Sequence, residues 1–366
     1  MDTREFALDL YGHLKEMEGN LFFSPLSVQL ALTRALLGAR GKTEMQMREV
    51  LRVGRERLPD VAQQVRLLEE SLRAASGVEG STLAIANKLW IQSGYRFLPE
   101  FLGLCGADLE QVDFIREANM IAGEINRWIE DNTNHKIRNM LSPGALDKMV
   151  RMVIANAVYF FDFWRSKFKK EQTRQDDFHV GPGQTVTTWL MNQVAQFPYY
   201  EGVGVQVLQM PYVGGRLSMV VVLPKAVDGL AYVEPRIGAI ESWLGDLRLR
   251  KVNVFFPRFK MEWGATELKG VLAAMGMPNA FNMISADFTG MEPKGELYIS
   301  QVKHKAFVDV NEEGTEAAAA TVVVTRMKAA FVEQPVVFRA DHPFIFVIWD
   351  EMTRTPIFMG RVVNPI

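Results

Sequence analysis

The sequence has a single cysteine, Cys105, among its 366 residues. One thiol cannot form an intrachain disulfide, and it excludes metal sites that need several cysteine ligands. The residues around it are mostly small or apolar, so we expect it to be a buried small hydrophobic side chain. The fold is therefore expected to depend on packing.

Long apolar runs are also absent. The longest, MVIANAVYFF at residues 152–161, is too short to cross a bilayer as a helix. The first fifteen residues, MDTREFALDLYGHLK, are charged from the second position and lack the apolar core of a signal peptide. We expect no membrane partner and a soluble chain, cytoplasmic if it is full length and secreted if a signal peptide has been removed.

Charge of either sign is not in large excess, since the formal net charge is −2. Such a chain has no overall field that would attract nucleic acid. Two short basic clusters, at residues 165–170 and 248–251, are interrupted by apolar residues. We interpret both as solvent-exposed faces or strand ends, and nucleic acid is not an expected partner.

Familiar catalytic and metal-binding motifs are missing. The sequence has no G-x-S-x-G, H-E-x-x-H or C-x-x-C motif. GARGKT at residues 38–43 resembles a phosphate-binding loop, but two residues rather than four separate its glycines, and a predicted helix precedes it. No two histidines are spaced to share a metal, so each is interpreted as a surface or structural residue. The histidines are His13, His135, His179, His304 and His342. We predict no catalytic residue, metal, cofactor or enzymatic activity.

The pattern of apolar residues changes along the chain. The N-terminal part has helical spacing, and one helix is expected to begin with Ser24 as its N-cap and Pro25 at its first position. From residue 152 onward strand patterns dominate, including a hairpin around Gly214 and Gly215. No linker divides the two parts. We therefore predict one α+β domain over residues 1–366, with a helix-rich part packed on large, mostly antiparallel sheets.

Residues 312–330, EEGTEAAAATVVVTRMKAA, have a mixed character. The alanines favour a helix, whereas the valines and threonines favour a strand. Arranged as a strand from Thr315, one face carries only small or β-branched, uncharged side chains. Such a face suits a strand that enters a sheet which has already formed. Taken alone, however, the segment fits an ordinary strand or an exposed alanine-rich helix equally well.

Several segments together resemble the serpin family, in the order in which that family has them. The segments are NLFFSPLSVQLALTRALLGARGKT, EINRWIEDNTNHKIRNML, VIANAVYFFDFW, VQVLQMPYVGGRLSMVVVLP, QVKHKAFVDVNEEGTEAAAAT and PFIFVIWDEMTRTPIFMGRVVNP. The resemblance covers nearly all of the chain. It implies the serpin fold, with an exposed reactive-centre loop at about residues 312–334 and a metastable native state.

The resemblance also implies a function, that of an irreversible suicide-substrate inhibitor of a serine protease. In serpins the loop is cleaved, the protease stays attached to it as an acyl ester, and the loop inserts into the main sheet as a new strand. The implied partner is a target serine protease, held covalently by a monomeric inhibitor. The alternative is a non-inhibitory serpin that acts as a carrier, storage protein or chaperone.

Matched by position, the cleaved bond joins Lys328 to Ala329, and Arg326 and Met327 are alternative sites of attack. Lysine or arginine there implies a trypsin-like target, and methionine implies one that resembles chymotrypsin or elastase. The matching hinge of the loop comprises Glu312, Glu313, Gly314, Thr315, Glu316, Ala317, Ala318, Ala319, Ala320 and Thr321.

Two further features follow from the resemblance. A polar cluster lies beneath the centre of the main sheet, where strands must separate, and a tryptophan lies where the loop enters. The matching residues are Ser24, Ser27, Asn156, His304 and Trp164. The helical stretch at residues 60–77, DVAQQVRLLEESLRAASG, is acidic rather than basic in its middle, so no heparin site is expected.

Overall fold

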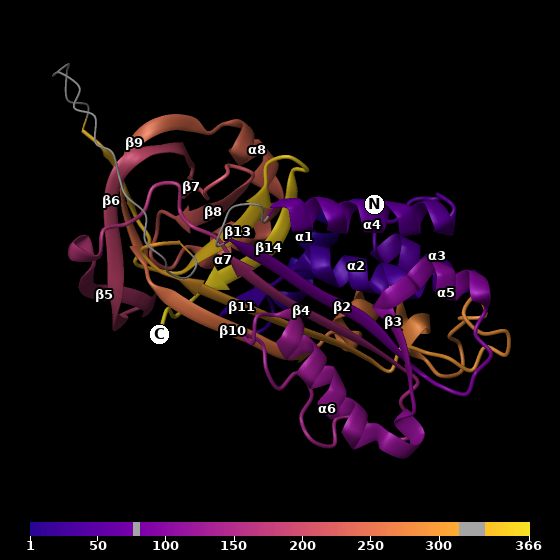
Figure 1. The fold of residues 1–366 in the computed structure, drawn as a ribbon. Coiled ribbons are helices and arrows are strands. Elements are labelled where there is room, and N and C mark those ends of the chain that lie inside the picture. The colour runs from indigo at the N-terminus through magenta and orange to yellow at the C-terminus, as the bar shows by residue number, and fades with distance from the viewer. Residues whose placement is uncertain (76–80, 315–333) are drawn as a thin grey trace.

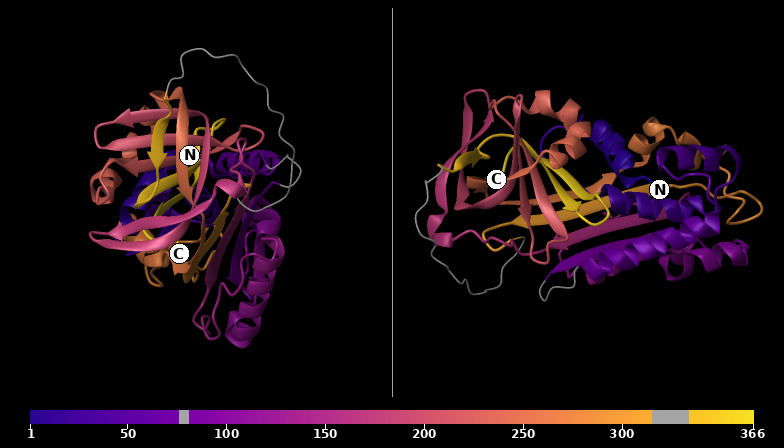
Figure 2. Two further views of the ribbon diagram at one scale, coloured as in Figure 1. Left: turned by 90° about the vertical axis from the view of Figure 1, so that its left-hand side faces the viewer. Right: turned by 90° about the horizontal axis from the view of Figure 1, so that it is seen from above.

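The computed structural model describes residues 1–75, 81–314 and 334–366. In Figure 1 most of the helices gather on one side of a five-stranded sheet, and α6 lies on the opposite side. A nine-stranded sheet forms the other end of the molecule, and Figure 2 shows both sheets from two further directions. The arrangement is therefore α+β, as predicted.

Helices dominate the N-terminal part. The main helices there are α1 (Thr3–Leu14), α2 (Pro25–Leu36), α3 (Gly41–Val50), α4 (Leu58–Ala75), α5 (Pro99–Cys105) and α6 (Phe114–Asn132). A 3₁₀ turn, η1 (Gly106–Asp108), follows α5 directly. Later helices are short: α7 (Leu230–Val233), α8 (Ile240–Gly245), α9 (Lys269–Met275), and the 3₁₀ turns η2 (Lys170–Gln172), η3 (Glu234–Ala239) and η4 (Pro278–Phe281).

The five-stranded sheet has the order β10-β11-β4-β2-β3. Its strands are β2 (Thr82–Gln92), β3 (Leu109–Val112), β4 (Met152–Phe161), β10 (Phe259–Glu267) and β11 (Gln301–Val310). The β10·β11 and β2·β4 pairs are antiparallel, whereas β11·β4 and β2·β3 are parallel. The sheet is thus mixed, and a parallel pair lies at its centre.

The nine-stranded sheet has the order β1-β14-β13-β8-β7-β6-β9-β12, and β5 pairs with β6 outside this path. Its strands are β1 (Leu21–Phe23), β5 (Arg174–Gly181), β6 (Gln184–Gly202), β7 (Val205–Pro211), β8 (Leu217–Pro224), β9 (Arg248–Pro257), β12 (Val336–Arg339), β13 (Phe344–Asp350) and β14 (Thr355–Val362). The predicted hairpin joins β7 to β8, and Gly214 and Gly215 both have positive φ there.

Strand β4 is buried on both faces, which explains its almost continuously apolar sequence. Ile154 and Val158 belong to the main core, which also contains apolar residues of α2. Val153 and Ala157 belong to a second core that includes Ile125 of α6. Helices α2 and α6 therefore cover the two opposite faces of the five-stranded sheet at β4, its central strand.

Among residues 1–75, 81–314 and 334–366, none of the helices combines the length and the hydropathy that a membrane crossing needs. The same residues contain no group of three or more His, Cys, Asp or Glu side chains arranged to hold a metal ion. Cys105 is buried, as predicted, and burial raises the pKa of its thiol to about 12.

Candidate functional site between β4 and β11

Strands β4 and β11 are direct neighbours in the five-stranded sheet. Their register runs from Gln301 opposite Val153 to Phe307 opposite Tyr159. Both strands point in the same direction, so their carboxyl ends lie together at one end of the sheet. The sequence-predicted residues that the structure describes gather at two places along this pair, its centre and its carboxyl end.

At the centre, a polar row crosses the sheet. Asn87 of β2, Asn156 of β4 and His304 of β11 occupy directly opposed positions. Ser24 and Ser27, from the first turn of α2, lie beneath them, and all five side chains are buried. The Asn156 amide donates to Ser27 Oγ at 2.5 Å and to Asn87 Oδ1, and Ser27 Oγ lies 3.0 Å from Asn87 Oδ1. The structure thus brings together four predicted residues and one that was not predicted.

The helix start of α2 fixes the two serines. Ser24 is the N-cap, as predicted, and its Oγ accepts a hydrogen bond from the Ser27 backbone N–H. The Ser24 hydroxyl also donates to the carbonyl of Ile357 in β14 at 2.7 Å. The cap therefore joins α2 to the nine-stranded sheet as well as to the polar row.

His304 is neutral in this network. Its Nε2 accepts from the Ser24 backbone N–H at 3.1 Å, so that nitrogen carries no proton. Its Nδ1 faces Asn156 Oδ1 and is therefore the protonated nitrogen, an assignment made from hydrogen-bond partners. Complete burial lowers the pKa of His304 to about 3. The whole central cluster consequently contains no charge.

Trp164 lies at the carboxyl end of the pair, just beyond β4. Its indole Nε1 donates to the carbonyl of Asn311 at 3.0 Å, and its ring stacks on Tyr212 with 4.6 Å between centroids. Its backbone N–H donates to the carbonyl of Glu313 at 3.0 Å. The tryptophan predicted for the loop entrance therefore contacts the segment that follows β11.

Glu312 is a buried carboxylate with an exposed fraction of 4%. Its Oε1 accepts from the Thr173 hydroxyl at 2.7 Å, and its Oε2 lies 3.6 Å from Nε of Arg258. Its backbone carbonyl accepts from the N–H of Phe168 at 3.0 Å. Two segments, the connection between β4 and β5 and the residue that follows β9, therefore hold the first residue of the predicted hinge.

Glu313 is held by two lysines of the segment that precedes β5. Its carboxylate lies 3.0 Å from Lys167 Nζ and 3.5 Å from Lys170 Nζ, and Lys167 lowers the pKa of that carboxyl group. The sequence interpretation of residues 165–170 as a solvent-exposed face or strand end holds for Arg165, Lys169 and Lys170, which are exposed, but it did not include the ion pairs of Lys167 and Lys170 with Glu313. Sequence patterns could not predict these pairs, because Glu313 lies more than 140 residues away in the sequence.

Gly314 is the last residue described before residues 315–333. Its φ is +149°, and a Cβ built there would lie 2.2 Å from the carbonyl oxygen of Asp162 and 2.6 Å from Cα of Phe163. Both neighbours are backbone atoms, so only glycine fits. The Asp162 side chain is buried beside this contact, and burial raises the pKa of its carboxyl group to about 7.

The other predicted loop residues lie outside the described residues. They are Thr315, Glu316, Ala317, Ala318, Ala319, Ala320, Thr321, Arg326, Met327, Lys328 and Ala329. Their proposed roles stay predictions.

Sequence reasoning missed Asn87, Thr173 and Arg258. Asn87 had a weak signal, because it is an amide in the middle of the stretch LAIANKLWI, where only the neighbouring Lys88 is also polar. Thr173 and Arg258 had none, because ordinary polar residues gain significance only from the tertiary fold that sets them beside Glu312.

Comparison with known families defines the class of protein. A family model described as serpin, serine protease inhibitor, matches residues 1–365. The chain belongs to the serpin family.

Relatives and solved structures agree with this assignment. A serpin-like protein of Thermococcus kodakarensis is 41% identical over 98% of this chain and 84% of its own length. Leukocyte elastase inhibitor A of Mus musculus is 38% identical, over 98% of this chain and 97% of its own. The structure of an Arabidopsis serpin in its native stressed conformation has a TM-score of 0.86 at 30% identity, and covers 100% of this chain and 99% of that one.

One expectation from the sequence is corrected by these findings. The absence of catalytic motifs led to the bare prediction of no enzymatic activity. The family model and the relatives instead describe proteins that act on proteases as inhibitors. That description replaces the negative one, which was drawn from motif absence alone.

Proposed function

We propose that this serpin is an irreversible suicide-substrate inhibitor of a trypsin-like serine protease. The observation that carries the proposal is the direct, parallel pairing of β4 with β11, followed by the glycine turn at Gly314. A segment that turned back at Gly314 and entered between these strands would run antiparallel to both. The small side chains from Thr315 onward suit such a segment.

Insertion is favourable in terms of backbone pairing. One parallel ladder would be replaced by two antiparallel ladders, and parallel pairing is slightly less stable per residue. The uncharged cluster of Ser24, Ser27, Asn156 and His304 supports the same movement, because neutral donors and acceptors can take new partners as the strands separate. A buried group left unpaired would cost about 1–3 kcal/mol.

The covalent step is an interrupted peptide hydrolysis. The hydroxyl oxygen of the protease serine attacks the carbonyl carbon of Lys328, and its proton passes to the general base of the protease. The bond from that carbon to the nitrogen of Ala329 breaks, and the new amine takes the proton. The products are an ester between Lys328 and the protease and a free amino group on Ala329. Insertion then moves the protease before water can cleave the ester.

The target class depends on the residue attacked. Lys328 would pair with the acidic specificity pocket of a trypsin-like protease. Met327 is the competing site, and several relatives are named leukocyte elastase inhibitors. Incubation with trypsin and separately with leukocyte elastase, followed by mass spectrometry of the released C-terminal peptide, distinguishes the two sites. A fragment beginning at Ala329 is expected with trypsin.

Formation of a covalent complex is the direct test. After incubation with trypsin, a denaturing gel is expected to show a band at the sum of the two masses less that of the released C-terminal peptide, residues 329–366. Clean cleavage without this band contradicts the inhibitory proposal and favours the carrier, storage or chaperone alternative. A protein with Thr315→Arg is a matched variant, because a buried charge at the first inserted position costs several kcal/mol. It is expected to be cleaved at the same bond without forming the complex.

Two accompanying proposals have their own measurements. The inhibitor is expected to act as a monomer, which sedimentation of the free protein checks.

Its rate of inhibition is expected to be unchanged by heparin, in contrast to the acceleration that a basic α4 would support.

A further inference from the structure

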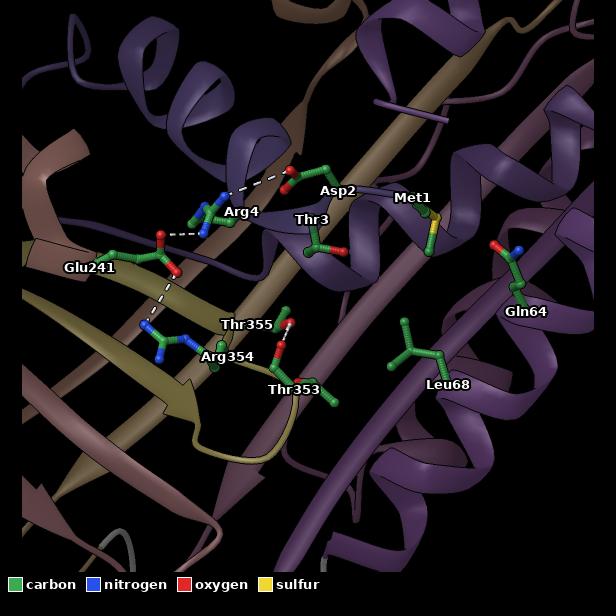
Figure 3. Close-up of a pocket in the computed structure, with 10 residues that line it drawn as sticks. All are labelled: Met1, Asp2, Thr3, Arg4, Gln64, Leu68, Glu241, Thr353, Arg354 and Thr355. Atoms are coloured by element: carbon green, nitrogen blue, oxygen red, sulfur yellow. Dashed lines mark hydrogen bonds and ion pairs between the residues drawn. The ribbon is translucent and has the colours of Figure 1, made fainter. Parts of the chain in front are cut away.

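Two hollows border α8, and their chemistry differs. The one in Figure 3 lies among α1, α4, α8 and the β13–β14 turn. Each charged residue that lines it is already paired, because Glu241 binds both Arg4 and Arg354, and Arg4 also lies 3.8 Å from Asp2. These pairs satisfy one another, so this hollow offers no charge to a ligand.

The second hollow, of about 290 Å³, lies between the β6–β7 turn and the short helices α7, η3 and α8. Its walls are mainly aromatic and aliphatic, with Tyr200, Tyr232 and Trp243 among them. Tyr232 is 42% exposed, and Val203 at the rim is 89% exposed. Apolar walls of this kind around a concave site are typical of small-molecule pockets. We call it the aromatic pocket.

The sequence of the turn shapes this pocket. A Cβ at Gly204 would lie 2.8 Å from Cε1 of Tyr232, and one at Gly202 would lie 2.6 Å from the hydroxyl oxygen of Tyr200. Gly204 also has a positive φ of +71°. The two glycines therefore let both tyrosine rings lie close to the backbone, which gives the pocket flat walls.

Arg236 provides the charge. Its guanidinium carbon lies 3.7 Å from the centre of the Tyr232 ring, and its Nη1 donates to the Tyr232 carbonyl at 2.5 Å. Of the eight described residues that line the aromatic pocket, Arg236 alone is charged. A guanidinium has five N–H donors, so most of its hydrogen-bonding capacity remains for a ligand.

We propose that the aromatic pocket binds a small planar aromatic anion. The ring of the ligand stacks against Tyr232 and Trp243, and its carboxylate or sulfonate pairs with Arg236. The proposal does not depend on protease inhibition, because the pocket uses none of the residues of the β4–β11 site.

Calorimetric titration of the whole protein with naphthalene-2-sulfonate tests this site. A dissociation constant below about 1 mM is expected. Val203→Lys should tighten binding and Val203→Glu should weaken it, and neither change endangers folding because Val203 is so exposed. Arg236→Gln should weaken binding about tenfold, while Arg248→Gln, an exposed arginine of β9 outside the pocket, should leave it unchanged.

A neutral probe separates stacking from charge. Naphthalene-2-methanol should bind more weakly than the sulfonate and respond to none of these charge changes. The proposal is overturned by an absence of sulfonate binding, or by equal effects of Val203→Lys and Val203→Glu. It is also overturned if Arg236→Gln leaves sulfonate binding intact.

Discussion

At the centre of the β4–β11 pair, the strands lie over a cluster of neutral groups, whereas at their carboxyl ends they are fastened by charges. Asn156 and His304 represent the centre, where the hydrogen bonds of both side chains join uncharged partners. Glu312 and Glu313 represent the end, where carboxylates contact Arg258 and two lysines. Neutral hydrogen bonds exchange partners readily, while a buried carboxylate depends on its cations. In the proposed insertion, the strands would separate at the neutral centre, while the charged end would hold the predicted hinge.

The largest effect is expected at the charged end, from Glu312→Lys. The change removes a buried carboxylate and sets a second cation beside Arg258, so we expect a loss of about 3–5 kcal/mol in the free energy of unfolding. Urea unfolding measures this loss. Glu171→Lys, at an exposed acid of η2, makes the same charge change and is expected to cost less than about 0.5 kcal/mol. If both variants lost the same free energy of unfolding, the ion pairs of Glu312 would not fasten the carboxyl end of the strand pair.

At the neutral centre, the main expected effect is on pH dependence. The pKa of His304 is about 3 in the fold and about 6.5 when unfolded, so between these values the unfolded chain binds the extra proton. Its contribution to stability is complete above pH 6.5 and declines as the pH falls, by about 3 kcal/mol at pH 4. Compared with His304→Gln, the parent protein should therefore lose more stability on acidification. If the free energy of unfolding changed with pH in the same way in both proteins, His304 would not be a buried neutral base.

Asp162 should give a smaller effect of opposite sign. Its pKa is raised to about 7 in the fold from an ordinary value near 3.9, so the folded protein binds the extra proton. The stability that this bound proton contributes is fully present below pH 4 and declines as the pH rises through 7. Asp162→Asn keeps an oxygen for the Phe163 N–H. Its stability relative to the parent should rise by about 2 kcal/mol between pH 5 and 7. If the difference in free energy of unfolding between the variant and the parent stayed constant from pH 5 to 7, the pKa of Asp162 would not be raised in the fold.

The sequence predicted the two regions unequally. Local rules were enough for the Ser24 cap, the Gly214–Gly215 hairpin and the buried strand β4, because caps, turns and apolar runs leave their pattern in adjacent residues. The grouping of Ser24, Ser27, Asn156 and His304 came from resemblance to a family. No spacing in the sequence connects Ser24 with His304, 280 residues later, although the fold puts them in hydrogen-bond contact.

The charged end was the harder region to predict. Its carboxylates were identified as hinge residues, but their cations were interpreted as an exposed basic cluster or were not singled out. An ion pair between distant residues depends on the whole tertiary fold, and neither partner differs in sequence from an ordinary surface charge. The aromatic pocket was missed for the same reason, because residues of β6, β7, α7, η3 and α8 form its walls together with Val203.

The central claim is that the closed β4–β11 pair is not the most stable arrangement of this chain. Its most direct test is the thermal midpoint of the protein before and after limited cleavage at Lys328. A new strand would form on the order of ten backbone hydrogen bonds, each worth about 1 kcal/mol. At about 1–2 °C per kcal/mol for a chain this long, we expect the midpoint to rise by more than about 10 °C. An unchanged or lower midpoint after complete cleavage would contradict the claim.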